Sequence, residues 1–141
     1  MKQKITKILV PMDGSQGSFK ALDKAIYLAR QCHATITGLC VLPIYTIQLG
    51  KLLTSLKNQS QKEAKKFLAD AKKQCAQNGI VFSEKIIYGN QSWEITEFAA
   101  YKNFDLIIMG SRGMGRVKKA FLGSVTNYVV HKSKVHVLVV K

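Results

Sequence analysis

Glycine and hydroxyl residues gather late in the chain, directly after a short apolar run, in a pattern that suits phosphate binding. The apolar run ends at Met109, is too short for a helix and is typical of a buried parallel strand. Gly110 and Gly113 follow it, and Gly123-Ser124 then begins an apolar helical segment. A strand, a glycine-rich loop and a helix N-terminus in this order present backbone N–H groups to an anion.

Each part of this pattern contributes separately. Glycine lets the backbone approach an anion closely and adopt positive φ. A helix N-terminus carries roughly half a unit of positive charge, and the hydroxyls of Ser124 and Thr126 are donors for phosphate oxygens. The simpler interpretation is a surface loop with Ser124 as a helix cap, but the strand, the helix start and the loop cations together favour a phosphate site. Those cations, which flank Gly115, are Arg112, Arg116, Lys118 and Lys119.

The glycine spacing excludes two common phosphate motifs. The Walker pattern G-x-x-x-x-G-K-[ST] needs a glycine followed by Lys and then Ser or Thr, which this loop lacks. The dinucleotide fingerprint G-x-G-x-x-G lies early in its domain, whereas these glycines lie late and follow the order G-x-x-G-x-G. A different phosphate loop is required.

The motif running from Gly110 through Gly113 to Gly123-Ser124, G-x2-G-x9-G-[ST], resembles that of the ATP-binding universal stress proteins. The early segment KILVPMDGS, from Lys7 to Ser15, and the final VHVLVVK are similar to the same family. The resemblance covers nearly the whole chain. It implies a nucleotide-dependent sensor or regulator of the stress response.

The resemblance also implies which residues hold the nucleotide. Adenine and ribose would lie against Pro11, Met12, Asp13 and Val41, with Asp13 on the nucleoside and the Val41 backbone on the adenine. From the residues alone, Asp13 is as typical of a turn as of a binding site, and Val41 indicates only a core position. Mg²⁺ or Mn²⁺ would bridge the phosphates, and the choice among ATP, ADP, AMP and a cyclic nucleotide stays open. The phosphate end would comprise Met109, Gly110, Ser111, Arg112 (as a charge-assisted fork), Gly113, Gly123, Ser124, Val125 and Thr126.

Composition predicts one cytoplasmic domain over residues 1–141. Apolar residues make up 47% of the chain, which is ordinary for a globular protein. No apolar run approaches the ~18 residues of a membrane span, and the first residues do not match a signal peptide. Three widely spaced cysteines without a C-x-x-C pair predict small buried side chains in a reducing compartment. The three histidines lack metal-ligand spacing, so no protein metal site is expected.

The net charge of +14 attracts polyanions. The cations are spread along the chain, and one helical segment carries several lysines in a pattern more typical of a solvated face than of a nucleic-acid stripe. Nucleic acid is therefore kept as a secondary partner. The segment in question holds Lys62, Lys65, Lys66, Lys72 and Lys73.

Apolar runs bounded by turn residues predict parallel strands. They cover Ile5–Val10, Ala34–Val41, Ile80–Tyr88, Asp105–Gly110 and Val135–Val140. Strands alternating with helices predict an α/β doubly wound, Rossmann-like domain with helices on both faces of a five-stranded parallel sheet. The family resemblance implies the strand order 3-2-1-4-5, with Asp13 and the glycine loop meeting across one crevice.

Capping residues and helical spacing locate the helices. Ser15 and Asn90 are expected N-caps, and Gly79 is expected to stop a long amphipathic helix. Trp93 is expected to pack in the core rather than stack on a base. The long helix runs from about Leu49 to Asn78, with an inner face of Leu49, Leu52, Leu53, Leu56, Ala64, Phe67, Leu68, Ala71 and Cys75.

The last strand, Val135–Val140, is almost wholly apolar and would lie at a sheet edge, where an unpaired strand is a template for another chain. The resemblance implies that it pairs with its copy in a homodimer. His136 departs from the small residue or proline common there in the family, and a solvent-facing role is expected for it.

Fast hydrolysis is not expected, because no carboxylate lies beside the glycine loop in the sequence to act as a base. The predicted protein binds ATP and is at most a slow ATPase. An adenylyltransferase or an ATP pyrophosphatase is an alternative, but it needs an S-G-G-x-D-S loop or paired His motifs. The Met12-Asp13-Gly14-Ser15 turn supplies neither.

Overall fold

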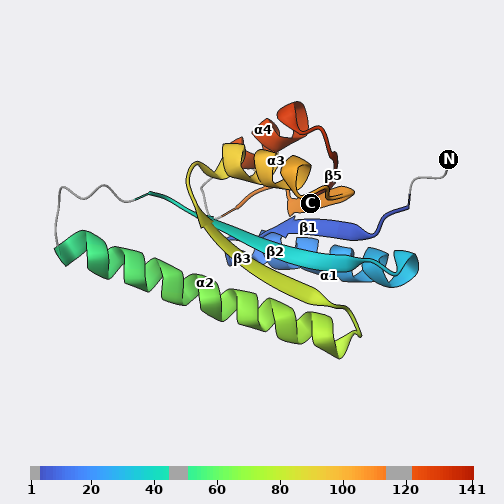
Figure 1. The fold of residues 1–141 in the computed structure, drawn as a ribbon, viewed down its shortest axis with the longest axis horizontal. Coiled ribbons are helices and arrows are strands. Elements are labelled where there is room, and N and C mark those ends of the chain that lie inside the picture. Colours follow the sequence, from blue (N-terminus) through green and yellow to red (C-terminus); the bar gives the residue numbers. More distant parts are fainter. Residues whose placement is uncertain (1–3, 45–50, 114–121) are drawn as a thin grey trace.

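Parallel strands and helices alternate along the chain in the computed structural model, which describes residues 4–44, 51–113 and 122–141 (Figure 1). Five residues named in the sequence analysis lie outside the described residues, namely the loop residues Gly115, Arg116, Lys118 and Lys119 and the expected helix start Leu49. The elements are β1 (Lys7–Pro11), α1 (Gln16–Cys32), β2 (Thr35–Leu42), α2 (Lys51–Gln77), β3 (Phe82–Tyr88), α3 (Gln91–Tyr101), β4 (Leu106–Gly110), α4 (Ser124–Lys132) and β5 (His136–Val140).

The five strands form one parallel sheet in the order β3-β2-β1-β4-β5, which confirms the predicted fold class and strand order. β1 pairs with β2 from Lys7 to Pro11, and it pairs with β4 at Ile8 and Leu9. The chain therefore leaves β1 in one direction for β2 and β3 and returns on its other side for β4. The carboxyl ends of β1 and β4 form the switch point where open α/β sheets bind ligands.

Alternate residues of the strands pack on opposite faces of the sheet. Ile8 and Val10 of β1 belong to a cluster with α1 and α2, and Leu9 belongs to a cluster with α3 and α4. Figure 1 shows these two helix pairs on either side of the sheet. Because both faces are covered, the central strands are mostly apolar and buried.

The predicted caps are confirmed. The Ser15 side chain accepts from the Ser18 N–H at 3.1 Å, and the Asn90 side chain accepts from the Trp93 N–H at 3.0 Å. Gly79 has φ of +71° just beyond the end of α2, a conformation that glycine adopts without a Cβ clash. These bonds join residues close in sequence, which is why local patterns were sufficient to find them.

Two residues predicted to be buried are not. Leu56 is 42% exposed, because the first turns of α2 project past the ends of β2 and β3 (Figure 1). Trp93 is 53% exposed, because α3 turns Ile95 and Ala99 toward the sheet and Trp93 lies on another side of the helix. Both errors arise from assuming that an apolar side chain near a helix start meets the core.

Cys40 and Cys75 are buried and Cys32 is half-buried, and all three are free thiols. Among the described helices, none combines the length and the apolar character needed to cross a membrane.

The Asp105 carboxylate ties the start of β1 to the start of β4. It was predicted as the first residue of a strand, but β4 begins at Leu106. Asp105 Oδ2 instead accepts from the Thr6 N–H at 2.9 Å, the Thr6 hydroxyl at 3.0 Å and the Lys7 N–H at 3.0 Å. Partial burial acts to raise the pKa of Asp105, but these bonds and the Lys7 charge together lower it.

We expect Asp105→Asn to lower the free energy of unfolding by about 1 kcal/mol at neutral pH, because the charge that strengthens three hydrogen bonds is lost. A lowered carboxyl pKa stabilises the fold above the pKa of the unfolded state, and this stabilisation disappears as the pH falls through the folded pKa. Urea unfolding at pH 7 and near pH 3 measures the difference between the two proteins. A difference that does not shrink in acid would contradict this role.

Candidate functional site

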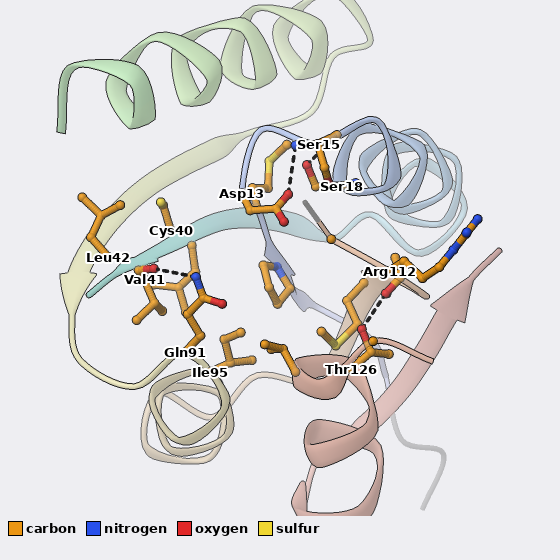
Figure 2. A pocket seen from close by; sticks show the side chains of 18 of the residues that line it. Asp13, Ser15, Ser18, Cys40, Val41, Leu42, Gln91, Ile95, Arg112 and Thr126 are labelled. Carbon is orange, nitrogen blue, oxygen red and sulfur yellow. Dashed lines mark hydrogen bonds between the residues drawn. The ribbon is translucent and has the colours of Figure 1, made fainter. Parts of the chain in front are cut away.

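A cavity of about 470 Å³ opens at the carboxyl ends of β1, β2 and β4, at the switch point of the sheet (Figure 2). Its size is typical of a small-molecule site. Every predicted site residue except Ser111 lines it, together with residues that the sequence did not indicate. The added residues are Ser15, Ser18, Leu39, Cys40, Leu42, Ser60, Glu63, Phe67, Gln91 and Ile95.

Ser111 holds the glycine loop in place from outside the cavity. Its N–H donates to the Val140 carbonyl at 2.9 Å, which continues the pairing of β4 with β5. Its carbonyl accepts from the Gly123 N–H at 2.8 Å. With both backbone groups used, Ser111 joins the end of the sheet to the start of α4 and offers no free N–H to a ligand.

Gly110 and Gly113 are needed for close approach rather than for positive φ. A Cβ at Gly110 would lie 2.9 Å from the Gly17 carbonyl oxygen, and a Cβ at Gly113 would fall on Asp13 Oδ2. Neither of these, nor Gly123, has positive φ, so that part of our expectation was wrong. The absence of side chains brings the first turn of α1, Asp13 and the loop after β4 together.

The N-terminus of α4 has no side-chain cap. Its N-cap is Gly123, which has no side chain to make a capping hydrogen bond. By contrast, the side chains of Ser15 and Asn90 cap α1 and α3. Ser124 and Val125, which begin α4, line the cavity. Uncapped N–H groups with the positive end of the helix dipole are suited to an anion.

Two side chains predicted to contact phosphate are arranged differently. The buried Thr126 hydroxyl donates to the Gly110 carbonyl at 2.8 Å, so its proton is already used in joining α4 to the end of β4. Figure 2 shows the Arg112 side chain extending away from Asp13 and from the other labelled side chains. The predicted guanidinium fork to a phosphate would require this side chain to turn toward the cavity.

The Asp13 carboxylate lies opposite the glycine loop. Asp13 Oδ1 accepts from the Ser15 N–H at 2.9 Å, while Oδ2 is the atom that a Cβ at Gly113 would meet. Asp13 and the glycine loop therefore meet across one crevice, as the family resemblance implied, although no carboxylate lies beside the loop in the sequence. Glu63 of α2 also lines the cavity. No group of three or more metal-ligating side chains is present in the described part of the chain.

The Val41 carbonyl faces the cavity because β1 ends too early to cover it. Met12 N–H donates to the Leu39 carbonyl at 2.8 Å, and two residues later the Val41 carbonyl points the same way, beyond the end of β1. Gln91 Nε2 donates to that carbonyl at 3.4 Å. Figure 2 shows the remaining amide oxygen of Gln91 turned toward the centre of the cavity.

Residues of α2 cover the cavity, and the sequence did not indicate them. Phe67 lies against Gly14, where a Cβ would approach the ring within 2.7 Å and where φ is +82°. Ser60 lies two turns earlier on the same helix. The helical spacing of α2 identified Phe67 as an inner residue, but only the crossover from β2 to β3 brings it over the end of β1.

The model of the universal stress protein family matches residues 4–141. The chain belongs to this family. It is 32% identical over 151 residues to the universal stress protein YxiE of Bacillus subtilis, a match that covers 96% of this chain and 98% of YxiE. The structure of universal stress protein UspA from Lactobacillus plantarum superposes with a TM-score of 0.90 at 27% identity, covering 99% of this chain and all of UspA.

Two further universal stress protein structures share the fold and were solved with nucleotides. One is a complex with cAMP, with a TM-score of 0.77 at 24% identity over 96% of this chain and 97% of that one. The other, from Archaeoglobus fulgidus, is a complex with dAMP, with a TM-score of 0.76 at 22% identity over 96% of this chain and 98% of that one. Adenine nucleotides thus bind to related structures.

Cys40 of this universal stress protein is a poor nucleophile although it lines the cavity. Burial, and secondarily the Asp13 carboxylate, raises the pKa of the Cys40 thiol to about 11. Burial alone raises the pKa of Cys75, which lies on the buried side of α2 and outside the cavity, to about 11 as well.

We expect Cys40 in the native protein to react with iodoacetamide at pH 8 roughly a hundredfold more slowly than a free cysteine, because so little thiolate is present. The rate should rise with pH up to about 11. Mass spectrometry of labelled peptides follows Cys40, with Cys75 as the matched buried thiol. Half-maximal reactivity of Cys40 below pH 9 would contradict the assignment.

Proposed function

We propose that this universal stress protein binds ATP in the cavity at the ends of β1 and β4 and acts as a nucleotide-dependent regulator rather than as a fast enzyme. The observation that carries the proposal is the N-terminus of α4, which has no side-chain cap and lies on the same cavity as Asp13 and Val41. One end of the cavity therefore suits an anion and the other suits a nucleoside. The cAMP and dAMP complexes of related structures support an adenine nucleotide as the ligand class.

Phosphates would be held mainly by the main chain. The amides at the start of α4, beginning with Ser124, offer donors and a favourable dipole. Gly110 and Gly113 allow the backbone segments at this end of the cavity to lie close together, since any side chain there would meet Gly17 or Asp13. Mg²⁺ or Mn²⁺ would be held by the phosphates themselves, as Mg²⁺ commonly is, without a dedicated protein cage.

The nucleoside would lie between Pro11-Met12-Asp13 and the end of β2. Asp13 has the acceptor oxygens that ribose hydroxyls need. The Val41 carbonyl and the Gln91 amide oxygen are acceptors, which suit the exocyclic amino group of adenine. Guanine and hypoxanthine carry a carbonyl at that position and would leave these acceptors facing another acceptor.

Slow turnover follows from how Asp13 is used. One of its oxygens accepts from the Ser15 N–H, which orients the carboxylate at the start of α1. A residue so placed serves binding better than it serves activation of a water at the far end of the phosphates.

We also propose that the protein is cytoplasmic and forms a homodimer through the open edge of β5.

Replacing Gly123 tests the phosphate end. We expect Gly123→Leu to weaken ATP binding at least about tenfold, because the leucine atoms beyond Cβ would occupy space between the loop after β4 and the start of α4, where the phosphates would lie. Calorimetric titration with Mg-ATP gives the affinity, and the melting temperature of the variant without nucleotide shows whether it folds. A folded variant with unchanged ATP affinity would refute the assignment.

Gln91 tests the base end. We expect the protein to bind ATP at least about tenfold more tightly than ITP, because ITP presents a carbonyl to the acceptors in the cavity. In Gln91→Met, which keeps the length of the side chain, the ratio of the two affinities should fall. An ATP preference that is unaltered in this variant would exclude Gln91 from base selection while leaving nucleotide binding itself in place.

A further inference from the structure

Positive charge is divided unevenly between the two helical layers. α1 carries three cations and one carboxylate, and α2 carries seven cations and two carboxylates, which gives a net charge of +7 for that layer. α3 carries two carboxylates and no Lys or Arg, and α4 carries one lysine, which gives a net charge of −1 for the other layer. Half of the net charge of +14 therefore lies on the helical layer formed by α1 and α2.

Within that layer, five lysines lie along one side of α2 in two groups about two turns apart, and we call them the lysine stripe. All five are exposed. At 3.6 residues per turn they fall within roughly a third of the helix circumference, and that third contains none of the buried residues of α2. The stripe consists of Lys62, Lys65, Lys66, Lys72 and Lys73.

The carboxylates of α2 lie on a different side of the helix. By the same helical spacing, Glu63 and Asp70 fall on the side that carries Gln74. The Gln74 amide hydrogen-bonds to Asp23 of α1, so this is the side that faces α1. The lysine stripe borders this side at Lys66 and Lys73, each about one turn from Asp70, and extends from there away from α1 toward the β3 edge of the sheet. Neither carboxylate of α2 falls within the third of the circumference that the stripe occupies.

The β3 edge does not neutralise the stripe. α2 packs against β3 and β2, and β3 carries one carboxylate, Glu84, and one cation, Lys85, both exposed. These two charges offset each other. The stripe thus presents five ammonium groups over a length of about 16 Å, at 1.5 Å per residue of helix.

We propose that the lysine stripe binds the phosphate backbone of a nucleic-acid duplex without reading its sequence. A duplex carries one negative charge per about 1.7 Å of its axis, so the length of the stripe matches a dense, rigid row of phosphates. Lysine contributes compact point charges rather than the bidentate forks that read bases or anchor partner proteins. Contacts of this kind position a protein on a backbone and carry no sequence information.

The surroundings of the stripe favour a duplex over other polyanions. Single strands are held by aromatic side chains on which bases stack, and no exposed large apolar side chain lies between residues 62 and 73. An amphipathic helix binds a membrane by inserting its apolar face, but Ala64, Leu68 and Ala71 are buried against the sheet. This inference does not depend on nucleotide binding, since the stripe lies outside the lining of the cavity.

The test compares two variants of equal net charge. In the first, the five lysines of the stripe become Gln. In the second, the same number of exposed lysines outside α1 and α2 become Gln, namely Lys4, Lys102, Lys132, Lys134 and Lys141. Fluorescence anisotropy measures binding to labelled duplexes of about 20 base pairs, in both DNA and RNA, across a series of salt concentrations. Thermal unfolding verifies that both variants fold.

For the unaltered protein we expect a slope of log affinity against log salt of about −4.5, as five phosphate contacts predict. The stripe variant should lose most of this slope and bind at least about tenfold more weakly at low salt, while the control variant keeps both values. Equal losses in the two variants would overturn the proposal in favour of overall charge. Stripe-dependent binding to phosphatidylserine vesicles with no binding to either duplex would also overturn it.

Discussion

Close contact between backbones at the carboxyl ends of β1 and β4 is the constraint on which the rest of the site depends. The first turn of α1 passes so near the loop after β4 that a Cβ at Gly17 would lie 2.6 Å from the Arg112 carbonyl oxygen. Gly110 meets the same turn from the other side. Because no side chains intervene, the starts of α1 and α4 reach the same cavity, and Asp13 can face Gly113.

The N-termini of the helices differ in whether they stabilise the fold or are suited to bind a ligand. α1 and α3 begin with side-chain caps that satisfy their own amides, so these helices stabilise the fold locally. α4 begins at a glycine and is fastened instead by Ser111 and by the Thr126 hydroxyl on Gly110. The helix is held firmly while its first amides are left to the cavity, and this combination supports an anion site there.

The long helix α2 takes part in two surfaces. One side covers the cavity with Ser60, Glu63 and Phe67, and another presents the lysine stripe. Leu68 and Ala71, between these sides, pack on the sheet. An amphipathic helix is usually described as having one buried and one solvated face. Here the solvated face is itself divided into an acidic side toward α1 and a basic side toward the β3 edge.

By itself, the sequence determined what depends on residues near one another in the chain: the apolar strands, the caps at Ser15 and Asn90, the stop at Gly79 and the glycine motif. The strand order came from family resemblance. Only the tertiary structure decided that Thr126 donates to Gly110, that Gln91 reaches the Val41 carbonyl and that α2 covers the cavity. These contacts join residues brought together by crossover connections, and no local pattern encodes where such a connection returns a side chain. The exposure of Trp93 was missed because only the packing of α3 on the sheet decides which side of the helix is buried.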